Sequence, residues 1–382
     1  MNRTDRVVLI GPGWPFKGGI ASHTTYLSRA LRDLGPTLFI SLRRQYPRWL
    51  YPGGDDRAPD NLTLYEQDAQ RLLAPLSPLS WWTSARVIAR ARPRCIVIPW
   101  WHVFWAPMVW SLLVLLRRHC PDARIVFLVH NAVGHEEQRF SRRLARCVLR
   151  GGDAWIVHAR SEMHTLHALL GDVPVDYQPH PAYPLGDREL PDRTRARAQL
   201  GLADAPTLLF FGFVRHYKGL DTLLRALALL RHAHPCQLVV AGEIWGDAGA
   251  WAKLIAELDL SEQVRLENRY IAEEDIAIYF ACADLVILPY RSATGSGVVK
   301  MAHSHGRPVV VTRTGALPDA VVDGVTGYVV PPEDPAALAA AIATFFDGTP
   351  RQPMEQAARD SARTDDWHQL ARTILADSRS PQ

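Results

Sequence analysis

Short apolar runs alternate with amphipathic stretches in the first part of the chain. Residues 6–11 (RVVLIG) are apolar, rich in β-branched side chains and followed by Pro-Gly, which predicts a buried strand. After a loop over residues 12–19, apolar residues recur at helical spacing from Ile20 to Leu34, and residues 37–41 predict a second strand. A strand, a glycine-rich loop, a helix and a strand in this order predict the opening of a doubly wound α/β unit.

The same alternation continues along the rest of the chain. Further strands are predicted over residues 95–99, 125–130, 154–158, 175–178, 207–211, 237–241, 264–267, 285–288 and 309–312. Helices are predicted between them over residues 106–118, 141–149, 162–170, 220–232, 251–258, 273–281, 297–304 and 335–346, with short elements at 317–321 and 327–330 and a last helix at 366–376. We therefore expect two Rossmann-like doubly wound domains with parallel sheets that face a cleft.

A stretch rich in Pro, Asp and Arg separates the two alternating blocks. It lacks apolar periodicity, which predicts a linker. The expected organisation is an N-terminal domain over residues 1–185, a linker over 186–205, a second domain over 206–365 and a closing helix over 366–382.

Composition and charge narrow the class of protein. The 382 residues are 48% hydrophobic and 21% charged, which excludes extensive disorder and coiled-coil architecture. The formal net charge of +4 suits an anionic small molecule or a bilayer surface better than a nucleic-acid groove, so no nucleic-acid partner is expected. The chain has five cysteines but no C-x-x-C pair, which argues against a disulfide framework. Residues 1–6 are polar and do not resemble a signal peptide, so a cytoplasmic protein is expected. The apolar stretch 95–116 contains Pro99, His102 and Pro107, so we interpret it as a strand and a helix rather than a membrane span.

Three junctions between a predicted strand and a helix carry candidate chemistry, because ligands of parallel sheets bind beyond the carboxyl ends of the strands. Gly18 and Gly19 precede a helix, where free amide groups can donate hydrogen bonds to a phosphate or sugar, although a tight structural turn has the same pattern. Arg215 and Lys218 lie three residues apart and predict a diphosphate contact rather than a solvated basic loop. Residues 290–297 offer small side chains, hydroxyls and amides, and a loop kept small for packing is the alternative.

A set of motifs resembles one enzyme family. The motifs are G-x-x-x-x-x-K-G at 212–219, V-V-A-G at 239–242, A-D-L-V-I-L-P at 283–289, G-R-P-V-V at 306–310 and the long run at 315–332, with Gly18-Gly19-Ile20, Trp100-Trp101-His102, His130-Asn131 and the terminal helix bearing Trp367. Together they resemble the retaining GT-B glycosyltransferases of family 4, in the branch with an A-T-x-S-G loop. The resemblance implies an acceptor-side N-terminal domain, a donor-binding C-terminal domain and a terminal helix that crosses back to the N-terminal domain.

The resemblance also implies site residues. Lys218 matches the family lysine that grips the nucleotide diphosphate, and Arg215 is displaced by two positions from the family arginine, where this chain has Phe213. The catalytic residues it implies are His102, Arg215 and Lys218. The donor-binding residues it implies are Gly18, Gly19, His130, Asn131, Gly212, Glu243, Tyr270, Ile271, Thr294, Gly295, Ser296 and Gly297.

One loop departs from the family pattern. The family has two glutamates eight positions apart, but this chain has Ala293 or Thr294 at the first position and Lys300 or Met301 at the second. Two hydrogen-bonding anchors of about 1.5–3 kcal/mol each are lost, and the hydroxyls of Thr294 and Ser296 are expected to replace them. Two other interpretations stay open: a catalytically silent nucleotide-sugar binder, and a sugar-nucleotide epimerase of the same fold, for which Glu243 is the one carboxylate at a junction.

Metal, acceptor and membrane hypotheses complete the picture. The pairs His164/His167 and His303/His305 lack an acidic or Cys partner at ligand spacing, so no metal and no cofactor is expected, and the nucleotide-sugar is a substrate. The resemblance implies an acceptor from surface polysaccharide, glycolipid or glycosylated-metabolite synthesis, with a lipid-linked acceptor at the inner membrane face as one form. Two residue groups fit a membrane-contacting face: the tryptophans at 100, 101, 105 and 110, and the arginines at 142, 143, 146 and 150. The alternative is that the tryptophans fill the core and the arginines form a solvated helix face.

Overall fold

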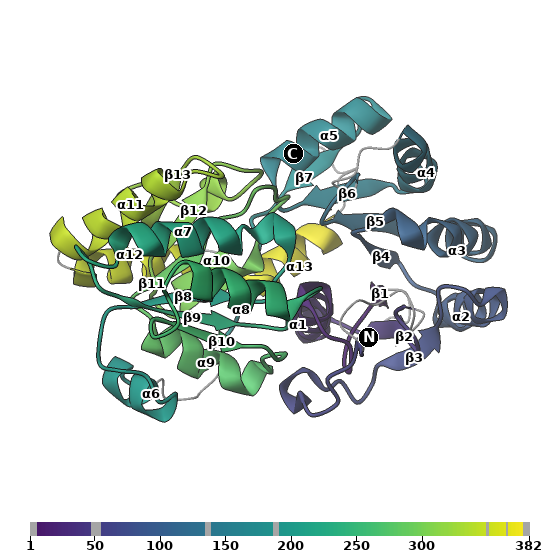
Figure 1. Cartoon of the computed structure of the whole chain (residues 1–382). Coiled ribbons are helices and arrows are strands. Elements are labelled where there is room, and N and C mark those ends of the chain that lie inside the picture. The colour runs from purple at the N-terminus through teal and green to yellow at the C-terminus, as the bar shows by residue number, and fades with distance from the viewer. Residues whose placement is uncertain are drawn as a thin grey trace. The chain divides into compact units, whose positions relative to one another are not determined.

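The computed structural model describes residues 6–46, 55–133, 139–185, 191–348, 351–363 and 366–376. The chain divides into two units (Figure 1). Unit 1 contains residues Met1–Pro179 and Asp366–Gln382, and unit 2 contains His180–Asp365. The segments 1–5, 186–190 and 377–382 of the expected first domain, linker and closing helix lie outside the described residues.

Unit 1 is built on a seven-stranded parallel sheet in the order β3-β2-β1-β4-β5-β6-β7. The strands are β1 (Val7–Gly11), β2 (Thr37–Leu42), β3 (Gln70–Leu73), β4 (Cys95–Trp100), β5 (Arg124–Val129), β6 (Ala154–Val157) and β7 (Val175–Tyr177). The helices are α1 (Gly19–Leu34), α2 (Pro78–Ala91), α3 (Ala106–His119), α4 (Arg139–Leu149), α5 (Arg160–Leu170) and α13 (Trp367–Leu375). Helices α2, α3 and α4 cover one face of the sheet, and α1 and α13 cover the other (Figure 1).

Unit 2 has a six-stranded parallel sheet in the order β10-β9-β8-β11-β12-β13. The strands are β8 (Thr207–Phe211), β9 (Gln237–Ala241), β10 (Val264–Glu267), β11 (Leu285–Leu288), β12 (Val309–Thr312) and β13 (Gly327–Val330). The helices are α6 (Arg193–Gln199), α7 (Leu220–Leu230), α8 (Ala248–Glu257), α9 (Glu273–Cys282), α10 (Gly297–Ser304), α11 (Pro335–Gly348) and α12 (Arg351–Arg363). Helix α11 packs on α7, and α12 packs on α10.

The apolar runs in the sequence become the central strands, because a parallel sheet is covered on both faces. Every residue of β1, β4 and β8 is buried. The predicted α/β class with two doubly wound parallel sheets is therefore confirmed. Among the described helices, none is both long and apolar enough to cross a bilayer.

The strand order reverses at one point in each sheet. In unit 1 the reversal falls between β1 and β4, and in unit 2 it falls between β8 and β11. At such a switch point, the connections that follow the two neighbouring strands run to opposite faces of the sheet. A crevice therefore opens at the carboxyl ends of these strands. The loops after β1, β4, β8 and β11 are the ones that hold the residue groups at 18–19, 102, 215–218 and 294–297.

Four elements were not predicted from the sequence. Strand β3 and helix α2 lie in a region without a prediction, and α12 is a polar helix. Helix α6 lies inside the expected linker, where the absence of apolar periodicity was misleading. Asp192 caps α6, and its buried Arg197 donates to Asp284 at 2.7 Å and to the Cys282 carbonyl at 3.1 Å. Ion pairs rather than apolar side chains anchor this helix, so hydrophobic spacing could not reveal it.

The C-terminal helix α13 packs on α1 within unit 1. The Trp367 ring lies 4.8 Å from the His23 ring and 5.5 Å from the Tyr26 ring, measured between centroids. His368 Nε2 lies 3.0 Å from Asp33 Oδ2. An apolar contact and a polar one therefore hold the end of the chain against the first helix.

Candidate active site

The loop after β8 is shaped by two glycines. Gly212 has φ 92° and Gly219 has φ 68°, in the left-handed region that favours glycine. A Cβ on Gly219 would lie 2.1 Å from the Pro289 carbonyl oxygen, so the loop can approach the end of β11 only without a side chain there. This close approach brings the loop after β8 and the loop after β11 together at the switch point.

Lys218 is a buried cation in this loop. Its side chain is only 8% exposed, and its ammonium nitrogen lies 5.4 Å from the centre of the Tyr290 ring. Burial and the neighbouring Arg215 lower the pKa of Lys218 to about 7. Among the described residues, no carboxylate forms an ion pair with this ammonium group. A Cβ on Gly212 would lie 3.1 Å from Nζ, so the glycine leaves the space around the ammonium group open.

Arg215 lies on an aromatic group that the sequence analysis did not predict. Its guanidinium carbon is 3.5 Å from the centre of the Trp245 ring and 5.9 Å from that of Phe213. Phe213 in turn contacts Trp245 at 5.1 Å and Tyr270 at 6.2 Å between centroids. The guanidinium is thus held by cation–π contact and lies three residues from Lys218. The aromatic residue in place of the family arginine was visible at position 213, but Trp245 comes from the neighbouring loop after β9.

The loop after β11 leads into α10. Ser296 caps this helix, since its hydroxyl accepts from Val298 N at 3.3 Å, and it lies 3.5 Å from the Tyr290 hydroxyl. A Cβ on Gly297 would lie 3.0 Å from the Tyr183 hydroxyl. The first turn of α10 therefore packs closely on Tyr183, which comes before β8 in the sequence. Thr294 is half-buried and Gly295 is exposed. The helix N-terminus therefore faces the same switch point as Lys218, as the strand order requires.

Three further predicted donor residues lie on the β9 and β10 side of unit 2. Glu243 is half-buried, and its carbonyl accepts from Val214 N at 2.9 Å. Tyr270 is half-buried beside Phe213, and Ile271 is 5% exposed. The backbone at Glu243 extends the sheet by one parallel bridge between Val214 and Ile244, which fixes this loop next to the one that holds Arg215.

The predicted residues of unit 1 come from three strand ends. Gly18, with φ 107°, caps α1 after β1, and a Cβ on Gly19 would meet nothing within 4 Å. His102 follows β4, is exposed and accepts from Phe104 N at 3.1 Å through Nδ1. His130 and Asn131 follow β5 and are half-buried. Packing within unit 1 therefore does not require Gly19 to be small.

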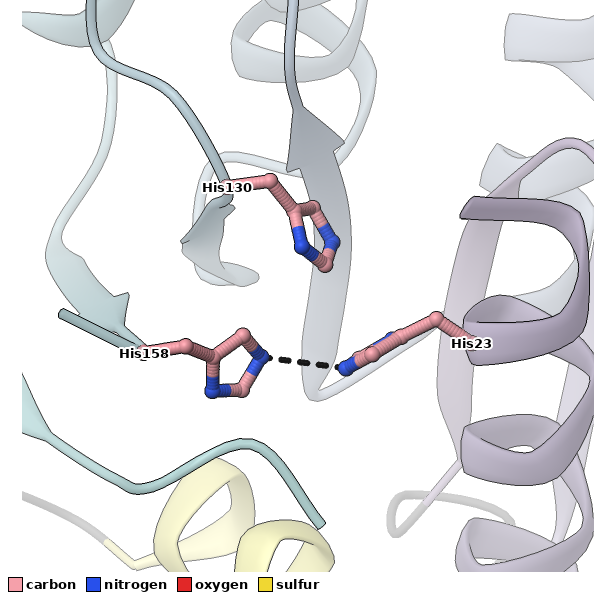
Figure 2. A group of neighbouring side chains, drawn as sticks. All are labelled: His23, His130 and His158. Carbon is pink, nitrogen blue, oxygen red and sulfur yellow. Dashed lines mark hydrogen bonds between the residues drawn. The ribbon is translucent and has the colours of Figure 1, made fainter. Parts of the chain in front are cut away.

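Two histidines that the sequence analysis missed lie beside His130 (Figure 2). His23 comes from α1 and is fully buried, and His158 follows β6. His23 Nε2 lies 3.0 Å from His158 Nε2, and the His130 ring centre lies 4.6 Å from that of His23. The three residues are separated by 107 and 28 positions in the sequence, so no local spacing could have predicted the cluster.

The four tryptophans at 100, 101, 105 and 110 divide between the core interpretation and the membrane-contacting interpretation. Trp100 and Trp105 are each 1% exposed and belong to the core of unit 1. Trp101 is half-buried against Trp105, whereas Trp110 on α3 is 54% exposed. Only Trp110 of this group is therefore left as a surface residue.

Two parallel Rossmann-like sheets, each with glycines and polar side chains at its switch point, are the architecture of the GT-B fold. Residues 205–347 match the family model described as Glycosyl transferases group 1. The chain is 36% identical over 247 residues to D-inositol 3-phosphate glycosyltransferase 1 of Catenulispora acidiphila, covering 61% of this chain and 58% of that protein. It is 34% identical over 185 residues to the Streptomyces scabiei enzyme, covering 46% and 41%. The chain thus spans about half the length of these curated relatives.

Solved structures agree on the fold. Sucrose-phosphate synthase from Thermosynechococcus elongatus superposes with a TM-score of 0.73 at 20% identity, covering 97% of each chain. Alr3699/HepE from Anabaena, solved in complex with UDP and glucose, superposes with a TM-score of 0.74 at 17% identity, covering 96% of this chain and 98% of that one. These likenesses show that the chain has the GT-B fold.

Proposed function

We propose that this protein is a glycosyltransferase that moves a sugar from a nucleoside diphosphate sugar to an acceptor hydroxyl with retention at the anomeric carbon. The observation that carries the proposal is the buried Lys218, which no described carboxylate neutralises, at the β8/β11 switch point. A buried ammonium group without an anion is costly, and a diphosphate would supply the missing charge. The match of residues 205–347 to the group 1 family model and the likeness to HepE, which was solved with UDP and glucose, support a nucleotide-bound donor.

The chemistry proposed for unit 2 is stabilisation of the leaving diphosphate. Lys218 and Arg215 would contact its oxygens, and the N-termini of α7 and α10 would add their positive ends. The bond from the anomeric carbon to the phosphate oxygen breaks, and the acceptor oxygen bonds to the same face of that carbon. The acceptor proton passes to the leaving phosphate oxygen, so no pair of enzyme carboxylates is needed, unlike in glycoside hydrolysis.

Hydroxyls and amides are proposed to replace the paired glutamates of the family loop. The Thr294 hydroxyl and the amides that begin α10 would contact the donor sugar or ribose, together with Gly295 and Gly297. Phe213, Trp245 and Tyr270 form an aromatic surface next to Arg215, which suits stacking of a nucleobase. Gly212, Glu243 and Ile271 are proposed donor contacts on the same side.

Unit 1 is proposed to bind the acceptor and to contact the donor. The N-terminus of α1 at Gly18 and Gly19 would contact the donor phosphate or sugar, and His102 and His130 with Asn131 would lie near the transferring sugar. His102 already accepts a hydrogen bond through Nδ1, so its Nε2 is the nitrogen proposed to act. The transfer itself is proposed to need no metal and no cofactor.

A donor screen followed by product analysis tests the proposal. A UDP-, GDP-, ADP- or dTDP-sugar at 100 times its dissociation constant should stabilise the protein by about 2.7 kcal/mol, which a thermal-shift screen detects. With the best donor and a panel of acceptors, the product should have the anomeric configuration of the donor by NMR. Donor binding without turnover would favour the silent binder, and epimerised donor formed without acceptor would favour the epimerase.

The acceptor is proposed to be presented at an anionic membrane surface. Three adjacent helices of unit 1 each carry an exposed aromatic side chain, with Trp82 44% exposed on α2, Trp110 54% exposed on α3 and Phe140 69% exposed on α4. The exposed Arg143 and Arg146 lie on α4. Aromatic side chains with neighbouring arginines are typical of an interfacial surface, which supports peripheral contact with acidic lipids.

A further inference from the structure

Three imidazoles converge at the carboxyl edge of the sheet in unit 1. His23 comes from the second turn of α1, His130 from the end of β5 and His158 from the end of β6. One nitrogen from each lies within 4.8 Å of the others (Figure 2). Side chains at the ends of neighbouring parallel strands meet at one edge, and α1 brings the third ring against them.

The spacing of the nitrogens is close to that of ligands around one small cation. A tetrahedral zinc ion with Zn–N bonds of about 2.0–2.1 Å separates its ligand nitrogens by about 3.3 Å. His23 Nε2 and His158 Nε2 are 3.0 Å apart. The His130 ring centre lies 4.6 Å from that of His23 and 5.4 Å from that of His158. Small rotations of the side chains would bring all three nitrogens within bonding distance of one ion.

The second nitrogen of His158 fixes the orientation of its ring. Nδ1 lies 2.8 Å from the Gln178 carbonyl oxygen and donates its hydrogen there. Nε2 then carries a lone pair, and this nitrogen is the one that lies 3.0 Å from His23 Nε2. A metal-binding histidine commonly has this arrangement, in which a backbone carbonyl holds the other ring nitrogen.

The surroundings of the cluster favour a defined geometry. His23 is fully buried. The Trp367 ring packs on His23 with 4.8 Å between centroids. An apolar ring beside the cluster excludes water from one side, and helix α13 thereby supports the position of His23.

We propose that His23, His130 and His158 form a binding site for one divalent transition cation, with Zn²⁺ as the preferred ion. Imidazole nitrogen suits Zn²⁺, Cu²⁺ and Ni²⁺, whereas Mg²⁺ and Ca²⁺ require oxygen ligands. Three protein ligands leave one coordination position for water or for an oxygen of a bound molecule. The site goes beyond the proposed sugar transfer, and His130 is the residue that the two proposals share.

Metal titration of the full chain tests the site. After removal of metal with a chelator and dialysis, calorimetric titration with Zn²⁺ at neutral pH should show one ion bound per chain. Co²⁺ in place of Zn²⁺ should give the visible absorption of a four-coordinate site. The His23→Gln and His158→Gln variants should each weaken Zn²⁺ binding by about 100-fold or more, because a ligand is lost.

The matched control is His164→Gln on α5, an exposed histidine outside the cluster. It should bind Zn²⁺ like the wild type. If a ligand variant does not fold, a crystal of the wild type soaked with Zn²⁺ should show an anomalous peak between the three rings. Equal Zn²⁺ affinity in His158→Gln and wild type, or an anomalous map without a peak at the cluster, would overturn the proposal and leave a hydrogen-bonded pair of histidines.

Discussion

Lys218 in unit 2 and His158 in unit 1 are both bases placed at the carboxyl edge of a parallel sheet, and desolvation lowers the pKa of both. Lys218 remains without a described carboxylate partner, while His158 has the Gln178 carbonyl and the His23 ring. The first arrangement leaves a buried amine whose protonated form an anion would stabilise, and the second is a neutral ring that is already hydrogen-bonded. The same position in two similar sheets therefore suits different ligands. A buried amine that can be protonated suits an anion, whereas a neutral imidazole suits a cation.

The largest expected effect comes from removing the buried charge of unit 2. Lys218→Met keeps the length of the side chain, and the loss of one group that stabilises developing charge should lower kcat/KM about 10²–10³-fold. Steady-state kinetics with the best donor measures this. Lys253→Met, at an exposed lysine on α8, is the matched control and should leave the kinetics unchanged. Unchanged transfer in Lys218→Met would contradict the donor-site assignment.

The pKa of Lys218 predicts a pH dependence that the histidine cluster does not share. Because the pKa is about 7 in the free protein, the cation that binds a diphosphate is lost as the pH rises. UDP affinity should fall by up to about tenfold per pH unit above pH 7, as measured by calorimetry. The same lowered pKa predicts that the free protein gains stability from about pH 7 to about pH 10, since only the unfolded state still binds the proton there. In Lys218→Met the affinity should be low and independent of pH over this range.

A pair of glycine substitutions separates packing from ligand approach in the two units. Gly219→Ala should destabilise the protein by about 1–3 kcal/mol or more, because its φ is 68° and a Cβ would overlap the Pro289 carbonyl. Gly19→Ala has open space around its Cβ and should leave the melting temperature nearly unchanged while it weakens donor binding. Thermal melts with and without donor measure both. Equal loss of stability in the two variants would contradict the distinction.

The smallest effect is expected at the surface of unit 1. Trp82→Ser combined with Trp110→Ser should reduce flotation with anionic vesicles several-fold, because each removes an exposed aromatic side chain. Leu229→Ser, at an apolar residue 62% exposed on α7 of unit 2, is the control and should float like the wild type. Failure of the wild type to bind anionic vesicles at low salt would remove the membrane proposal.

Local spacing explains which parts of the site were predictable. Arg215 and Lys218 lie three residues apart in one loop, and Gly18 and Gly19 are adjacent, so their patterns stand in the sequence itself. Trp245 joins Arg215 only because β9 pairs with β8, and His23 joins His130 only because α1 packs across the strand ends. Helix α6 was missed for a related reason: its anchor is the ion pair of Arg197 with Asp284, 87 residues away.

The sequence alone determined the alternation of strands and helices, because burial on both faces of a parallel sheet requires continuous apolar runs and the covering helices require apolar residues at helical spacing. It also marked the loops where glycines and cations follow a strand. Only the tertiary structure decided which side chains from distant segments meet, whether Trp100 and Trp105 are core or surface, and that Lys218 is desolvated. Those properties depend on strand order and packing, which bring together residues that no local pattern connects.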